Sequence, residues 1–267
     1  MSCLFLSILR VSVTLWLIHA MSNRKFNWYK YASPANFYPL AGKMIPWFSV
    51  ITIILFAVGL YVGFFVAPRW GGDQKEAYHI IFIHVPAAWM GMFLYVLMAI
   101  YAGIGWAFNA RLASMMATAI STTGAIFTFI SLVTGSLWGR PAWGVWWVWD
   151  ARMTSTLILL FLYIGFISLQ SSIDDPRRAD RAGAVLALVG LINVPIIYFS
   201  VQWWNTLHQG ATITRKGYQM VPSQLTAMLI LLAACWIYSV AVVLARVRYI
   251  IREREREAPW LSAEAVS

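Results

Sequence analysis

Charged residues divide the chain into long uncharged stretches. Six of these stretches exceed 20 residues, and they cover positions 44–68, 77–110, 112–139, 153–173, 182–214 and 217–245. A helix that crosses a bilayer needs about 20 consecutive, mainly apolar residues, so each stretch has room for one crossing. The pattern predicts six spanning helices, at 45–66, 84–108, 114–137, 154–171, 183–203 and 223–245.

Composition supports a membrane protein. Of the 267 residues, 61% are hydrophobic and 11% are charged, and the mean hydropathy is +0.69. A soluble domain has about 25% charged residues, which argues against a soluble enzyme. The expected fold class is therefore all-α: a polytopic integral membrane protein built as a six-transmembrane-helix bundle.

Basic residues give the expected orientation. Six crossings place both termini on one side, and the connections 67–83, 138–153 and 204–222 on the other. These three connections hold six of the 20 Lys and Arg residues, and the remaining 14 lie in the termini and the other connections. The positive-inside rule then places both termini in the cytoplasm. It also accounts for the net charge of +10, so nucleic acid is not an expected partner.

The chain divides into three expected parts. Residues 1–43 form an N-terminal cytoplasmic segment, 44–245 form the six-helix domain, and 246–267 form a charged cytoplasmic tail. Within the first part, residues 1–20 fit a signal peptide poorly. They are either an interfacial helix or, as we favour, an extension upstream of a natural start at Met21.

Tryptophan is concentrated between the third and fourth predicted helices. Five indoles lie within 12 residues, at Trp138, Trp143, Trp146, Trp147 and Trp149. An aromatic belt at the membrane interface is the simple explanation, but it needs fewer tryptophans per helix end. The intervening Gly139, Pro141 and Gly144 disfavour a regular helix through 139–144. We expect a shaped connection that offers a platform for a flat hydrophobic ligand.

Two histidines flank the same side of the predicted bundle. His84 opens the second helix just before Pro86, and His208 follows the fifth helix. A single histidine at an interface is usually only a hydrogen-bonded polar residue. Two imidazoles beside an aromatic platform, however, match the needs of a six-coordinate haem iron, for which His is a common axial ligand. His84 and His208 are therefore the candidate metal ligands, and haem b is the candidate cofactor.

Charged residues near the tryptophans fit the same hypothesis. Arg140 and Arg152 flank the cluster, and a guanidinium pairs well with a carboxylate such as a haem propionate. Asp150 is expected to orient an indole or a partner arginine. The chain has no GxxxxGK[ST], CxxC or CxxCH motif, so nucleotide hydrolysis, thiol exchange and covalent haem attachment through those motifs are not expected. We therefore expect a binding or transport subunit, not an enzyme.

These residues resemble a known family. The run WGRPAWGVWWVWD at 138–150 is similar to the WWD signature of haem-handling proteins. Ile83-His84-Val-Pro, the segment 127–136 and WWNTLHQG at 203–210 resemble the cytochrome c maturation protein C family, over roughly residues 40–245. The resemblance implies that His84 and His208 are axial ligands of non-covalently bound haem b and that the tryptophan run contacts it.

The resemblance also implies a location and partners. Such proteins lie in the bacterial inner membrane among its lipids, bind haem on the periplasmic side and promote its transfer to a periplasmic haem chaperone. They work beside ABC-type ATPase and permease subunits and a small single-span membrane subunit. Three alternatives remain: a haem lyase or cytochrome c synthase subunit, a dihaem cytochrome b, and a plain polytopic transporter. The first two are less favoured because no histidine lies deep in a predicted span, and the third leaves the tryptophan run unexplained.

Overall fold

Six long apolar helices make up most of the protein. The computed structural model describes residues 28–68, 75–204, 206–208, 213–214, 217–218 and 220–264. Six segments in this part are long and apolar enough to cross a membrane, which confirms the predicted fold class. They are Pro34–Val66, Ala77–Phe108, Arg111–Trp143, Ala151–Ser172, Pro176–Trp203 and Pro222–Arg254.

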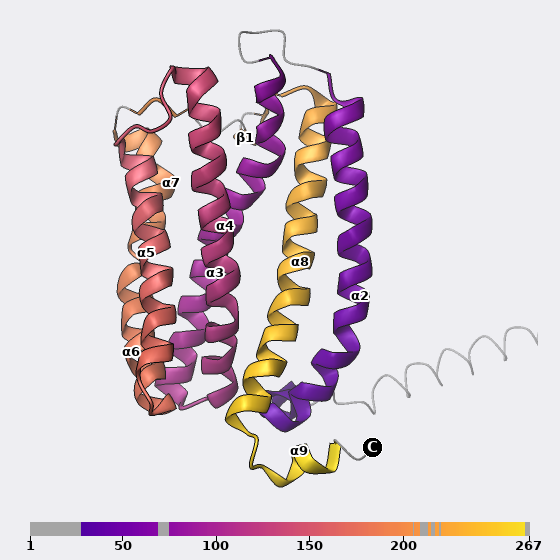
Figure 1. Cartoon of the computed structure of the whole chain (residues 1–267), viewed down its shortest axis with the longest axis vertical. Coiled ribbons are helices and arrows are strands. Elements are labelled where there is room, and N and C mark those ends of the chain that lie inside the picture. The colour runs from indigo at the N-terminus through magenta and orange to yellow at the C-terminus, as the bar shows by residue number, and fades with distance from the viewer. Residues whose placement is uncertain are drawn as a thin grey trace, which may run out of the picture.

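The helices are arranged as an elongated bundle (Figure 1). Helix α2 (Pro34–Tyr61) packs against α8 (Pro222–Arg254), and a π-helical turn, η2 (Val62–Val66), continues α2. The 3-10 turns η1 (Trp28–Ala32) and η3 (Lys75–Ile80) precede α2 and α3. Helices α3 (Ile81–Phe108) and α4 (Arg111–Trp143) form the closest pair, and α5 (Ala151–Ser172), α6 (Pro176–Gly190) and α7 (Asn193–Trp203) pack beside them. A two-residue hairpin, β1 (Ile213–Thr214) with β2 (Gly217–Tyr218), precedes α8.

Small residues let α3 and α4 approach closely. A Cβ at Gly91 of α3 would lie 2.7 Å from Oγ1 of Thr128 in α4, so no larger residue fits there without movement. Gly91 also receives a hydrogen bond on its carbonyl from the buried Tyr163 hydroxyl of α5, at 2.8 Å. Lipid tails are as apolar as the helix surfaces, so moving an apolar side chain from lipid to a helix–helix contact gains little hydrophobic free energy. Close packing and interhelical hydrogen bonds therefore hold such helices together.

The described ends of the chain lie together at one end of the bundle (Figure 1). Trp260 in the short helix α9 (Pro259–Glu264) packs against Tyr38 near the start of α2, with ring centroids 6.0 Å apart. Arg254 at the end of α8 donates from both guanidinium NH₂ groups to the Asp180 carboxylate of α6, at 3.0 to 3.1 Å. The even number of crossings is thus confirmed, and the cytoplasmic orientation of the termini stays a prediction.

Two predictions about helix limits are wrong: the end of the third span at residue 137, and an unbroken fifth span over 183–203. Helix α4 continues through Gly139 and Pro141 to Trp143, where Gly144 with φ +80° ends it. Pro141 removes a single backbone hydrogen bond within the last turn, and the helix tolerates that loss. The fifth span is broken at 191–192, between α6 and α7. Pro195 has no N–H to bond with the carbonyl of Leu191, which accepts instead from Val194 at 3.2 Å.

Every span begins earlier than predicted, and the starts of α2 and α3 have local causes or consequences. Helix α2 starts at Pro34, because Ser33 caps it by accepting from the Asn36 amide at 3.4 Å and proline suits a first turn. Helix α3 starts at Ile81, so His84 lies one turn inside it and Pro86 is internal. Residues 1–27 lie outside the described residues, and the expectations for 1–20 remain predictions.

Candidate functional site

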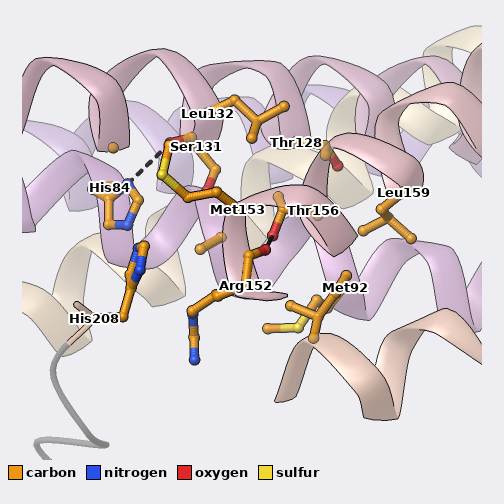
Figure 2. Close-up of a pocket in the computed structure, with 14 residues that line it drawn as sticks. His84, Met92, Thr128, Ser131, Leu132, Arg152, Met153, Thr156, Leu159 and His208 are labelled. Atoms are coloured by element: carbon orange, nitrogen blue, oxygen red, sulfur yellow. Dashed lines mark hydrogen bonds between the residues drawn. The ribbon is translucent and has the colours of Figure 1, made fainter. Parts of the chain in front are cut away.

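A pocket lies at the end of the bundle opposite the described termini. Residues of α3, α4, α5 and α7 line it, together with the segment that follows α7 (Figure 2). Its polar lining includes His84, Arg152 and His208, and its apolar lining includes Met92, Leu132 and Leu159. The free space is about 30 Å³, roughly that of one water molecule. A larger ligand therefore requires these side chains to move apart.

His84 is held by α4, the neighbouring helix. Its Nδ1 lies 3.1 Å from the Ser131 carbonyl oxygen and 3.1 Å from Oγ1 of Thr134. A backbone carbonyl only accepts hydrogen bonds, so Nδ1 carries the hydrogen and Nε2 keeps its lone pair. The imidazole fits because residue 135 is glycine: a Cβ there would lie 3.0 Å from Cε1 of His84.

His208 is held by a carboxylate. Its Nδ1 lies 3.0 Å from Oδ2 of Asp150, whose side chain is only 6% exposed. The other oxygen of Asp150 accepts from the Met153 amide at 2.8 Å and so caps the start of α5. The carboxylate can only accept, so His208 also keeps a lone pair on Nε2. Asp150 thus orients a histidine, a contact that was not predicted from the sequence.

Both imidazoles therefore carry their hydrogen on Nδ1 and keep the lone pair of Nε2 free of it. Figure 2 shows the two rings beside each other at one end of the pocket. Burial lowers the pKa of His208 below its ordinary value, and the hydrogen bond from Nδ1 to Asp150 partly opposes that shift. A lowered pKa keeps the ring neutral near pH 7, which is the form that binds metals. A metal-bound histidine usually donates its other N–H to a carboxylate or a backbone carbonyl, and these two rings have one partner of each kind.

The two candidate arginines differ in position. Arg152 is half-buried and lines the pocket. Among the described residues, no carboxylate lies within salt-bridge distance of Arg152. Arg140 is exposed and outside the pocket lining, where it donates to the Gly144 carbonyl at 2.9 Å and lies 5.8 Å from the Trp146 ring centroid. The structure brings Arg152, but not Arg140, to the histidines.

The tryptophans surround the pocket and do not line it. Trp138 lies in α4 and packs its edge against His84, with ring centroids 5.8 Å apart. Trp143 packs against His208 in the same manner at 4.9 Å. Trp147 and Trp149 contact each other at 5.4 Å, and the rings of Trp146 and Trp149 are largely exposed. Two indoles therefore support the histidines, and the exposed pair lies on the surface of the connection between α4 and α5.

Several lining residues were not among the predicted ones. Gly135 and Ser131 have no side chain typical of haem ligation, Met153 acts on Asp150 through its backbone amide, and no sequence motif marks the three residues. They matter because they shape or hold His84 and Asp150, which depends on the packing of α4 against α3 and on the cap of α5.

Fold and pocket together define a multi-pass membrane protein with paired imidazoles and a half-buried arginine at one end of a helical bundle. Residues 27–262 match the family described as heme exporter protein C. The chain belongs to this family.

Relatives with the same description cover most of the chain. Heme exporter protein C of Escherichia coli (strain K12) is 43% identical over 86% of this chain and 93% of its own length. The protein of that name from Bradyrhizobium diazoefficiens is also 43% identical, over 88% and 90% of the two chains. A putative cytochrome c biosynthesis ccmC-like mitochondrial protein of Marchantia polymorpha is 41% identical over 67% of this chain and 76% of its own.

Membership of this family places the chain among haem-handling proteins of cytochrome c biogenesis. It is a transport subunit and not a catalytic enzyme. With six spanning helices, it is a multi-pass protein of the inner membrane.

Proposed function

We propose that this protein binds haem b between His84 and His208 and presents it, on the periplasmic side, to a haem chaperone for cytochrome c biogenesis. The observation that carries the proposal is that the two imidazoles are oriented by hydrogen bonds of the same kind. Each has a hydrogen-bond acceptor at Nδ1, and each therefore offers the lone pair of Nε2. Iron with two imidazole ligands, one on either face of the macrocycle, suits this pair.

The other polar group of the pocket suits the propionates. A half-buried guanidinium without a carboxylate partner is costly, and an anionic ligand relieves that cost. Arg152 interacts electrostatically with Asp150 but forms no ion pair within 4.0 Å among the described residues, and it lies beside His208 (Figure 2). Because the free space is about 30 Å³, haem enters when the two histidines separate. Trp146 and Trp149 are exposed on the connection between α4 and α5. There the indole faces offer stacking surface to the porphyrin.

The proposed setting follows from charge and family. The excess of basic residues at the end that carries the described termini favours a cytoplasmic position for that end, so the pocket faces the periplasm. The chain has no nucleotide-binding motif, so ATP-driven work falls to ABC-type ATPase and permease subunits. A small single-span subunit and the chaperone complete the proposed membrane complex.

Haem spectra of single and double variants test this function. His84→Ala and His208→Ala should each remove most of the low-spin haem from the purified protein, and the double variant should remove it all. His79→Ala is the matched control, because His79 is also buried at the same end but packs on Phe64, outside the pocket lining. A normal low-spin spectrum in the double variant would show that the ligands lie elsewhere.

The covalent haem–chaperone adduct in membranes tests delivery. Because the chaperone is confined to the periplasm, adduct formation also reports the side on which the pocket opens. We expect adduct with the wild-type protein and with His79→Ala, and none with the double variant. Full adduct formation in the absence of this protein would refute the delivery role.

A further inference from the structure

A second cavity lies at the opposite end of the bundle from the histidines. It has a volume of about 470 Å³ and is formed where α3 ends and where α4 and α6 begin. Three arginines, Arg111, Arg177 and Arg181, line it together with Trp106 and Asp180. It contains no histidine, cysteine or methionine, so it is not a second site for haem iron.

The acidic groups near this cavity are already engaged. Asp180 accepts hydrogen bonds from Arg254, and Glu255 pairs with Arg111 at 2.8 Å. Asp175 accepts from the Arg177 backbone amide at 2.8 Å, but within the described ranges neither the Arg177 nor the Arg181 guanidinium forms an ion pair within 4.0 Å. These two arginines are four residues apart and so lie on the same face of α6, where like charges repel each other. An anion between them removes that repulsion.

The position of the cavity selects the kind of anion. The span that contains α3 ends here at Phe108, and the span that contains α6 begins here at Pro176. The cavity therefore lies where the membrane meets water. Trp106 and Phe108 are 49% and 77% exposed, and such aromatic side chains typically sit at the headgroup level of a bilayer. A free phosphate makes no favourable contact with this apolar rim. A phospholipid places its phosphate on the arginines and its glycerol and acyl chains against the rings of Trp106 and Phe108.

We propose that this cavity binds the phosphate headgroup of an anionic phospholipid from the leaflet on the side of the described termini. Basic pockets between transmembrane helices are a recurring form of anionic-lipid site. The uncapped start of α4, where Ala110 provides no side-chain hydrogen bond, adds unpaired backbone N–H groups beside Arg111. The lipid joins the ends of α3, α4 and α6 on the side away from the haem pocket, so the proposal is independent of the proposed haem function.

Native mass spectrometry of the purified full-length protein tests this site. The protein is presented with equal amounts of phosphatidylglycerol and phosphatidylethanolamine, and the retained lipid is identified. We expect one tightly held phosphatidylglycerol. The double variant Arg177→Gln/Arg181→Gln should bind it on the order of 25-fold more weakly, because each basic residue near a membrane surface contributes about fivefold. The single variant Arg181→Gln gives a milder test, with a loss of about fivefold.

The matched control removes the same charge outside the cavity. Arg178→Gln/Arg252→Gln also replaces two exposed arginines at this end of the bundle, and neither residue lines the cavity. It should retain phosphatidylglycerol as the wild-type protein does. Equal retention by the cavity variant and the control would overturn the proposal, as would equal retention of phosphatidylethanolamine. Millimolar inorganic phosphate should leave the lipid bound, and displacement of the lipid by phosphate would identify a free-phosphate site instead.

Discussion

Asp150 has two separable tasks, and its substitution offers a sharp test of the haem site. One carboxylate oxygen accepts from the Met153 amide and caps α5, and the other accepts from Nδ1 of His208. Asn is as good a helix cap as Asp, so Asp150→Asn preserves the first task. It disturbs the second, because the amide has only one oxygen. With that oxygen on the Met153 amide, the NH₂ group faces Nδ1 of His208 and moves the imidazole hydrogen to Nε2, the atom proposed to bind iron.

The size of the effect follows from similar sites. Loss of the group that orients a metal-bound histidine typically costs 10–100-fold in metal affinity. We therefore expect Asp150→Asn to weaken haem binding by about 10–100-fold, with the free energy of unfolding almost unchanged. Asp150→Ala should weaken haem binding as much and should also lower the free energy of unfolding by about 1 kcal/mol, because the cap is lost.

Haem titration of the apoprotein, followed by the Soret band, measures the affinity, and chemical unfolding measures the stability. Asp175→Asn is the matched control. Asp175 caps α6 by accepting from the Arg177 and Arg178 amides at 2.8 and 3.2 Å, far from both histidines. If Asp150→Asn bound haem like the wild-type protein and Asp175→Asn, His208 would not depend on the carboxylate, and the proposed preparation of its Nε2 would be wrong.

Two further predictions concern the shape and the charge of the pocket. Gly135→Ala should reduce low-spin haem in the same titration, because its Cβ presses on His84 at 3.0 Å, whereas Gly103→Ala, whose nearest neighbour is 3.4 Å away, should not. Equal haem content in both variants would contradict this. Arg152→Gln should weaken haem binding by about tenfold, as expected for loss of a charge-assisted hydrogen bond, while Arg140→Gln should change it less than twofold. The opposite order would assign the propionates to Arg140.

The fold class and the placement of His84, His208 and the tryptophan run at one end of the bundle were predictable from the sequence, for physical reasons. Uncharged stretches must be long to cross a bilayer, so the number of spans was visible in the positions of the charges. An even number of crossings then brings His84, His208 and the tryptophan run to one end, whatever the details of packing. The exact limits of the helices do not alter this parity, which is why errors of up to 11 residues at the start of α2 had no effect on it.

Features that depend on packing were not predictable. The break before α7 has a local cause in Pro195, but a proline inside a membrane span often gives only a kink, so the sequence did not distinguish the two outcomes. The contact between Asp150 and His208 joins residues 58 positions apart. Residue spacing along one helix or strand does not reveal such a contact. The role of Gly135 likewise depends on the distance between α3 and α4.

The two histidines are held with unequal rigidity, and this difference suits a protein that must release what it binds. His84 lies inside α3, and α4 fixes its ring through the Ser131 carbonyl. His208 lies beyond the end of α7, outside any described helix, and its imidazole is held by a hydrogen bond to Asp150 and by packing against Trp143. Because the free space is only about 30 Å³, haem binding on the proposed function requires the rings to separate, and we expect the less restrained ring to move. On the proposed function, His84 is therefore the fixed ligand, and displacement of His208 opens the face of the haem from which an acceptor takes it.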